Sequence, residues 1–201
     1  MYNKYDIFRN LFMYYFLAGL LFFIFIILNI FSENKSIHNF MKYIFIIFRS
    51  SIVLLFIAHT LGLIARWYIS GHAPWGDAYE SMIYVAWATM GIGLLFIKKS
   101  DLTLASTSFV TSMILMIAHW NWMDPSIANL VPVLNSYWLM IHVSVIVGSY
   151  GPFALSMILG FVSLLLIVFI TRTNKEKIKN QLSELTTVSY THLTLPTKRI
   201  V

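Results

Sequence analysis

The stretch LFMYYFLAGLLFFIFIILNIF, residues 11–31, contains no charged side chain. A helix of about 20 apolar residues is long enough to cross the hydrocarbon core of a bilayer, which is about 30 Å thick. The whole chain shares this character, because 59% of its 201 residues are hydrophobic and only 11% are charged. A soluble domain contains about 25% charged residues. The composition therefore predicts an all-α protein, a polytopic transmembrane helical bundle whose backbone is hydrogen-bonded within each helix.

Apolar runs along the chain predict about five membrane spans. They cover residues 11–31, 44–69, 79–97, 102–119 and 137–171. The fourth run is the richest in Ser and Thr, which indicates a helix packed against other helices. The last run is too long for one perpendicular crossing, and Pro152 is expected to kink it because proline removes a backbone donor.

The distribution of Lys and Arg predicts the orientation of these spans. The segments 70–78 and 120–136 contain no Lys or Arg, whereas the connecting segments on the other side contain several. The positive-inside rule therefore places 70–78 and 120–136 on the outer face. Lys4 and Arg9 oppose this orientation, because five spans leave the N-terminus outside. Most basic residues flank apolar runs, so they are interpreted as topology anchors and no nucleic-acid partner is expected.

The stretch SGHAPWGDAYESM, residues 70–82, places much polar and aromatic chemistry at the outer membrane edge. One interpretation is structural: Asp77 caps a helix, and Glu80 is stabilised in its first turn by the helix dipole. The other is functional: His72, Trp75 and Glu80 line a cavity at the outer face, because ionisable groups at membrane level often mark functional sites. The residues alone leave both interpretations open.

Two histidines lie within apolar runs. His142 has Trp138 four residues before it and Ser149 seven residues after it on the same helix face. A neutral imidazole among apolar neighbours suits an axial position on heme iron, although a hydrogen bond to another helix would also explain it. His59 lies seven residues before Arg66 on the same helix face. Two interpretations stay open: the pair binds heme iron or a propionate, or His59 makes a hydrogen bond to another helix.

Two other features of the sequence narrow the chemistry. Arg49 and Arg66 lie near the ends of the second span, where long side chains are expected to snorkel towards water. The chain contains no cysteine, which excludes a disulfide framework and a thiolate nucleophile within it.

The blocks GHAPWGDAYESMIYVAW and MDPSIANLVPVLNSYWLMIHVSVIVGSYGPFALSMILG closely resemble the CcsA/ResC family of cytochrome c biogenesis proteins. The resemblance covers about residues 45–186. It is closest to the CcsA part of the fused CcsB–CcsA synthetases of system II. It implies residence in the bacterial inner (cytoplasmic) membrane, with the outer loops on the periplasmic side.

The resemblance also implies roles for particular residues. His142 matches the first external histidine that ligates heme beside a tryptophan-rich segment. His72, Pro74, Tyr79, Glu80 and Ser81 match the family block H-x-P…Y-E-S. The predicted heme-binding residues are His142, His72, Trp75, Tyr79, Glu80 and Trp138, with His142 as the metal ligand and no catalytic side chain.

The function implied is heme transport from the inner to the outer face and presentation to apocytochrome c. There the vinyl groups form thioethers with the cysteines of a CxxCH motif. The expected substrate is heme b, and the expected partners are apocytochrome c, CcsB/ResB and the lipid bilayer. Such a protein is part of a cytochrome c heme lyase.

The sequence also departs from the family pattern. The tryptophan-rich WWD segment, the second external histidine, a transmembrane histidine and the CcsB portion are absent from it. Back-translation of VSYTHLTLPTKRIV, residues 188–201, resembles adapter DNA from sequencing libraries. We therefore expect a CcsA-like membrane domain over 1–187, truncated before the WWD segment, a non-native tail over 188–201, and no synthetase activity from this fragment.

Two other classes of membrane protein fit some of these residues. A b-type heme electron-transfer subunit would use His59 and His142 as a pair of axial ligands. A multi-pass transporter would bind no heme. The two matched blocks favour cytochrome c biogenesis over both.

Overall fold

The computed structural model describes residues 7–31, 35–71, 73–74, 77–97, 100–120, 137–168 and 175–194. Within these ranges every regular element is a helix, which confirms the predicted all-α class. The helices are α2 (Ile7–Phe31), α3 (Lys35–Ser70), α4 (Ala78–Leu95), α5 (Asp101–His119), α6 (Tyr137–Val168) and α7 (Lys175–Thr194).

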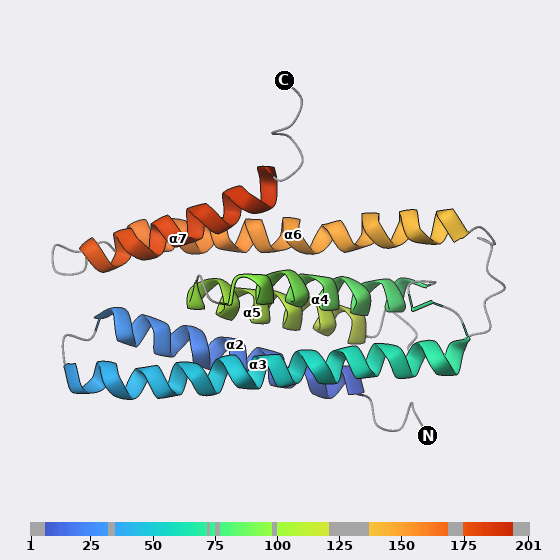
Figure 1. Ribbon diagram of the computed structural model, residues 1–201, viewed down its shortest axis with the longest axis horizontal. Helices are drawn as coiled ribbons and strands as arrows, with labels where there is room; N and C mark the ends of the chain where they lie inside the picture. Colours follow the sequence, from blue (N-terminus) through green and yellow to red (C-terminus); the bar gives the residue numbers. More distant parts are fainter. Residues whose placement is uncertain are drawn as a thin grey trace.

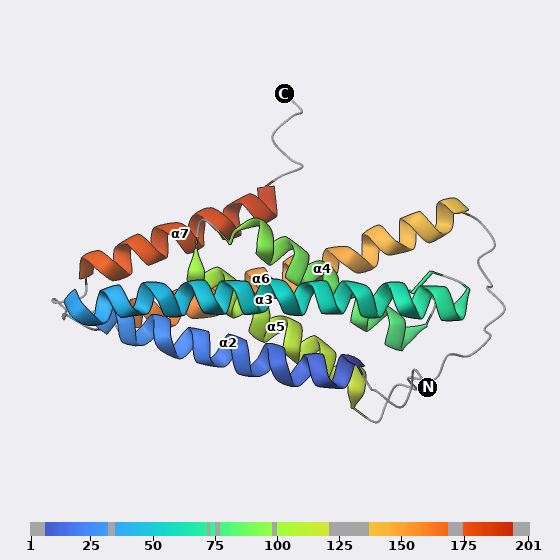
Figure 2. The ribbon, with the colours of Figure 1, turned by 60° about the horizontal axis from the view of Figure 1, so that its bottom comes forward.

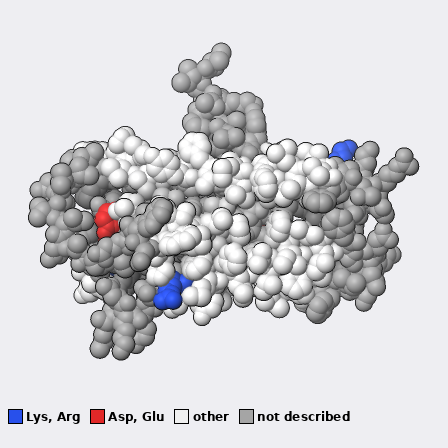
Figure 3. Space-filling view, turned by 180° about the vertical axis from the view of Figure 1, so that it is seen from behind, with Lys and Arg blue, Asp and Glu red and all other residues white. Residues whose placement is uncertain are grey.

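The helices form layers, with α4 and α5 between the pair α2 and α3 and the pair α6 and α7 (Figure 1). α2 lies beside α3 and α5, and α4 lies beside α5 and α6. A view turned by 60° keeps α2 next to α3 (Figure 2). From behind, the described charged residues appear only towards the edges of an uncharged central face (Figure 3). Such a face is suited to lipid or to other apolar helices.

Four of the described helices are long and apolar enough to cross a membrane. They contain Ile7–Asn29, Met41–Ser70, Asp101–His119 and Ile141–Val168. The predicted third span is present as α4, but it is not among these four because its first turn carries Tyr79, Glu80 and Ser81. The multi-pass membrane prediction is therefore confirmed, whereas the expected five spans become four spans and α4, a shorter helix packed among them.

The Ser/Thr-rich helix α5 packs tightly against its neighbours, as predicted. The Ser108 hydroxyl donates a hydrogen bond of 3.1 Å to the carbonyl of Tyr15 in α2. A Cβ on Gly19 of α2 would lie 3.0 Å from the backbone nitrogen of Phe109, so glycine permits this close approach. Small and hydroxyl side chains thus bring the α2 and α5 backbones together.

α6 is one continuous helix through Pro152, so this proline does not end it. Its middle packs against α4, where a Cβ on Gly151 would overlap the side chain of Thr89. α7 packs against α6 and buries Ile178, Leu185 and Val188. α7 also lies beside α5. There, burial and the negative charge of Asp101 raise the pKa of the Glu184 carboxyl.

Candidate functional site

The C-terminal end of α3 and the N-terminal ends of α4 and α6 lie at the same end of the bundle (Figure 1). α3 ends at Gly71, whose φ of +70° is in the left-handed region that glycine adopts at low cost. The Gly71 N–H donates to the carbonyl of Trp67 at 3.0 Å, and the Ser70 hydroxyl donates to the same carbonyl. These bonds close the last turn of α3 and direct the chain towards α4.

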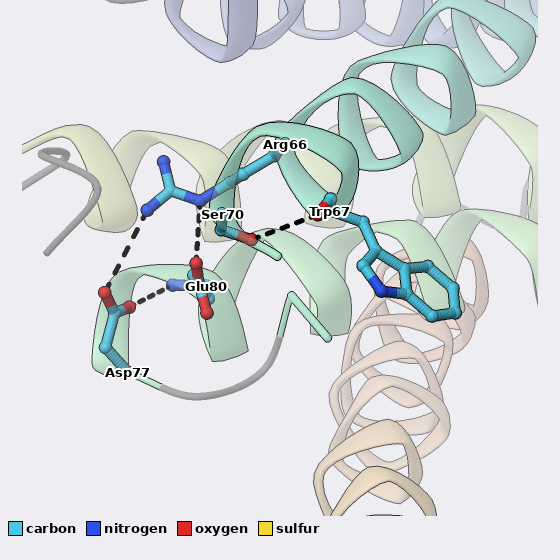
Figure 4. Close-up of polar contacts among 5 residues, drawn as sticks. All are labelled: Arg66, Trp67, Ser70, Asp77 and Glu80. Carbon is cyan, nitrogen blue, oxygen red and sulfur yellow. Dashed lines mark hydrogen bonds and ion pairs between the residues drawn. The ribbon is translucent and has the colours of Figure 1, made fainter. Parts of the chain in front are cut away.

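A buried ion pair joins the ends of α3 and α4. The Nε of Arg66 donates to the Oε1 of Glu80 at 3.0 Å, and both side chains are 1% exposed (Figure 4). The Nη2 of Arg66 lies 4.0 Å from the Oδ2 of Asp77. One guanidinium therefore faces two carboxylates that the chain supplies eleven and fourteen residues later.

Asp77 has a second role, because its other carboxylate oxygen caps α4. The backbone N–H of Glu80 donates to the Oδ1 of Asp77 at 2.6 Å, and the Ser81 N–H donates to the Asp77 carbonyl at 2.9 Å. The predicted N-cap is therefore confirmed. An acid at this position accepts backbone donors that the first turn of a helix leaves without partners.

Aromatic rings continue this cluster towards the middle of the bundle. The guanidinium carbon of Arg66 lies 5.0 Å from the centroid of the Tyr79 ring, within the range of a cation–π contact. Phe8 of α2 makes edge-on contacts with Tyr79 and with His59, at 6.5 Å and 5.6 Å between ring centroids. Cation, phenol and imidazole therefore lie along one contiguous region between α2, α3 and α4.

His59 makes a hydrogen bond between helices, which is one of the two alternatives that the sequence left open. Its Nε2 lies 3.2 Å from the carbonyl oxygen of Ile83 in α4, and because a carbonyl only accepts, Nε2 is the donor. The His59 side chain is 0% exposed. In this arrangement it is closed to a large planar ligand.

One face of α4 bears an aromatic stack. Trp87 stacks on Tyr84 at 5.9 Å and on Phe56 of α3 at 5.8 Å between ring centroids. The Trp87 indole N–H donates to the Thr60 hydroxyl at 2.9 Å. These contacts join α4 to α3 further along the helix than the Arg66 ion pair.

His142 and Trp138 lie apart from the buried cluster, in the N-terminal half of α6. The His142 side chain is exposed, and Trp138 is 78% exposed. Their spacing of four residues puts both on one helix face. Within the described residues no group of three His, Cys, Asp or Glu side chains forms a metal site, so His142 is a single potential ligand there.

The six predicted heme-binding residues thus fall into three sets. Tyr79 and Glu80 are brought together, but as partners of Arg66, and both are buried. His142 and Trp138 are exposed on α6. His72 and Trp75 lie outside the described residues. The heme-binding role of all six stays a prediction.

Sequence reasoning missed the importance of Arg66 and misplaced its side chain. It was expected to snorkel towards water, but it is buried against Glu80. Arg49 is 39% exposed and pairs with Asp101 at 2.7 Å and 2.9 Å. The available signal was the scarcity of acids. In a chain with eight acidic residues, a carboxylate beside a helix end is the expected partner of an arginine at membrane depth.

Comparison with known proteins identifies the family of this chain. A family model described as cytochrome C assembly protein matches residues 75–195. The chain is 45% identical over 138 residues to the protein NrfI of Wolinella succinogenes, covering 68% of this chain and 15% of that protein. It is 31% identical over 156 residues to the cytochrome c biogenesis protein CcsA of Prochlorococcus marinus (strain MIT 9515), covering 71% of this chain and 46% of the relative. It is also 39% identical over 117 residues to CcsA of Guizotia abyssinica, covering 53% and 34%.

The fold and the site define a multi-pass helical membrane protein whose buried ion pair and exposed histidine lie towards one end of the bundle. With a family model matching more than half of its residues, the chain belongs to the cytochrome c assembly family. Two of these relatives are named as cytochrome c biogenesis proteins. The chain spans 15% of the first of these relatives and less than half of the second.

Proposed function

We propose that this chain is part of a protein that presents heme to apocytochrome c at the outer face of the bacterial inner membrane, with His142 as an axial iron ligand. One observation carries the proposal: a histidine and a tryptophan are exposed on the same face at the outer end of α6, in a member of the cytochrome c assembly family. An exposed imidazole can approach iron, and an exposed indole offers a flat apolar surface to a porphyrin.

The orientation belongs to the same proposal. The segments 70–78 and 120–136 lack Lys and Arg, so the positive-inside rule favours the periplasmic side for them. That side is also where α4 and α6 begin. Heme b is the proposed substrate, and apocytochrome c and a CcsB/ResB protein are the proposed partners.

The chemistry requires positioning more than activation by a side chain. Each cysteine thiol of a CxxCH motif adds its sulfur and its proton across a vinyl double bond, so a thioether forms and no group leaves. A site that holds heme beside the thiols replaces a bimolecular encounter with an effectively unimolecular one. His142 would fix the heme plane, and Trp138 would cover part of its face.

The structure favours this function over a b-type electron-transfer subunit. That alternative needs His59 as a second axial ligand, but the ring is 0% exposed and its Nε2 is bound to the carbonyl of Ile83. A rearrangement of α3 against α4 would have to precede ligation.

The test is the heme content of the full-length protein that carries this sequence, measured by pyridine hemochrome after purification. His142→Ala is expected to lose most of the heme and to regain part of it with added imidazole. Val145→Ala is the control, because this side chain is 67% exposed one turn away on α6. A His142→Ala protein with wild-type heme content would refute the ligand assignment.

A further inference from the structure

We infer that Arg66 is the positioning residue of the outer site: it fixes the placement of α4 and, through α4, that of the helix that carries His142. This inference rests on the proposed function. Nothing in the family comparison assigns a role to this arginine, and sequence reasoning placed it at the membrane surface.

The start of α4 encloses the guanidinium of Arg66. Its Nε contacts Glu80 at 3.0 Å, its Nη2 lies 4.0 Å from Asp77, and its carbon lies 5.0 Å from the Tyr79 ring centroid. All three partners lie within the first turn of α4 or at its cap. Because the side chain is 1% exposed, water does not compete for these contacts.

Only arginine can make this set of contacts. Its planar fork presents donors to two carboxylates while its flat face lies on an aromatic ring. A lysine ammonium is a compact point charge that can approach one carboxylate but cannot bridge the same three groups. The contacts therefore fix both the height and the rotation of α4.

Contacts between α4 and α6 connect the Arg66 cluster to the helix that carries His142. Tyr84, one turn after Glu80, lies against Gly148, where a Cβ would be 3.6 Å from its ring. Further along, a Cβ on Gly151 would lie 3.1 Å from the backbone nitrogen and Cα of Thr89. Two glycines of α6 are thus in close contact with α4, and the first is six residues from His142. A shift of α4 would move these contacts.

A purely stabilising role explains the arrangement less well. Burial of an ion pair removes two charges from water, and replacing such a pair with apolar residues is often neutral or stabilising. A geometric role accounts for why one arginine and two acids are placed together in a chain that is only 11% charged.

Three variants of the full-length protein test the inference. Arg66→Lys keeps the charge, and Arg66→Gln removes it. Arg49→Gln is the control, because Arg49 also pairs with a carboxylate, Asp101, but in the N-terminal half of α3, away from the start of α4. Each is combined with Val85→Cys, which places a thiol at a buried position of α4, in a background without other cysteines.

Two readouts are measured: the rate of maleimide labelling at position 85, and the visible spectrum and reduction potential per bound heme. Both Arg66 variants are expected to raise the labelling rate at least about threefold, because local opening of α4 exposes the buried thiol more often. They are also expected to change the spectrum or potential of the heme, whereas Arg49→Gln changes neither. Glu80→Gln replaces Arg66→Gln if that variant does not fold.

Each other outcome overturns the inference. Unchanged labelling would show that Arg66 does not hold α4, and equal effects of Arg49→Gln would show general destabilisation. Faster labelling with an unchanged heme spectrum would confine Arg66 to local stability. The proposed function fails separately, if His142→Ala retains wild-type heme or the wild-type protein binds none, and the labelling comparison still reports on Arg66 in those cases.

Discussion

The N-terminal end of α4 and the N-terminal half of α6 both belong to the sequence blocks that resemble the CcsA/ResC family, yet their environments are opposite. At the start of α4, Arg66 and Glu80 are each 1% exposed and Tyr79 is 5% exposed. On α6, Trp138 is 78% exposed and Val145 is 67% exposed. One region pairs its charged side chains within the chain, and the other presents apolar surface and a histidine outwards.

This difference separates two kinds of residue that one motif search would treat alike. A buried ionised group that has partners fixes geometry, and its loss leaves another charge unpaired. An exposed histidine beside an exposed tryptophan contributes little to packing, so it is available to a ligand or to further protein. The comparison therefore supports a structural role for the α4 end, and it agrees with the binding role proposed for the N-terminal half of α6.

The largest effect is predicted for a substitution in the buried region at the start of α4. Glu80→Leu removes the carboxylate that accepts from the buried guanidinium of Arg66, and loss of one partner of a buried ion pair costs about 3–5 kcal/mol. Thermal and denaturant unfolding of the protein in detergent measures this. A loss below about 1 kcal/mol, the usual range of a surface pair, would contradict the closed description.

A smaller effect is predicted where α6 packs against α4. Gly151→Ala adds a methyl group that overlaps Thr89, and overpacking typically costs about 1–3 kcal/mol. Gly160→Ala on the same helix is the control, because a Cβ there meets nothing within 4 Å. Alanine in helical open space is expected to be neutral or to stabilise by about 0.4–1 kcal/mol. Equal effects of both substitutions in an unfolding assay would show that α4 and α6 are not closely packed.

The smallest effect on stability is predicted in the exposed N-terminal half of α6. Trp138→Ala removes a ring that is 78% exposed, so the free energy of unfolding should change by no more than about 0.5 kcal/mol. Heme retention should nevertheless fall, because the proposed porphyrin surface is lost. A large loss of stability with unchanged heme retention would reverse the roles assigned to the two regions.

Local features of the chain were predicted well from the sequence. The helical class, the limits of most apolar helices, the capping role of Asp77 and the packing role of the Ser/Thr-rich α5 all follow from neighbours within a few residues. The number of spans was less certain, because the polar first turn of α4 makes this helix less apolar than the other four.

The sequence by itself determined that this chain is a helical membrane protein, since so apolar a chain must satisfy its backbone internally. It also determined which histidines and acids are candidates for chemistry. Only the tertiary structure decided that Arg66 is paired and buried, that His59 bonds to Ile83, and that His142 is exposed. These outcomes depend on which helices meet, because a polar group at membrane depth takes the nearest partner on a neighbouring helix, and that neighbour is set by packing of the whole bundle.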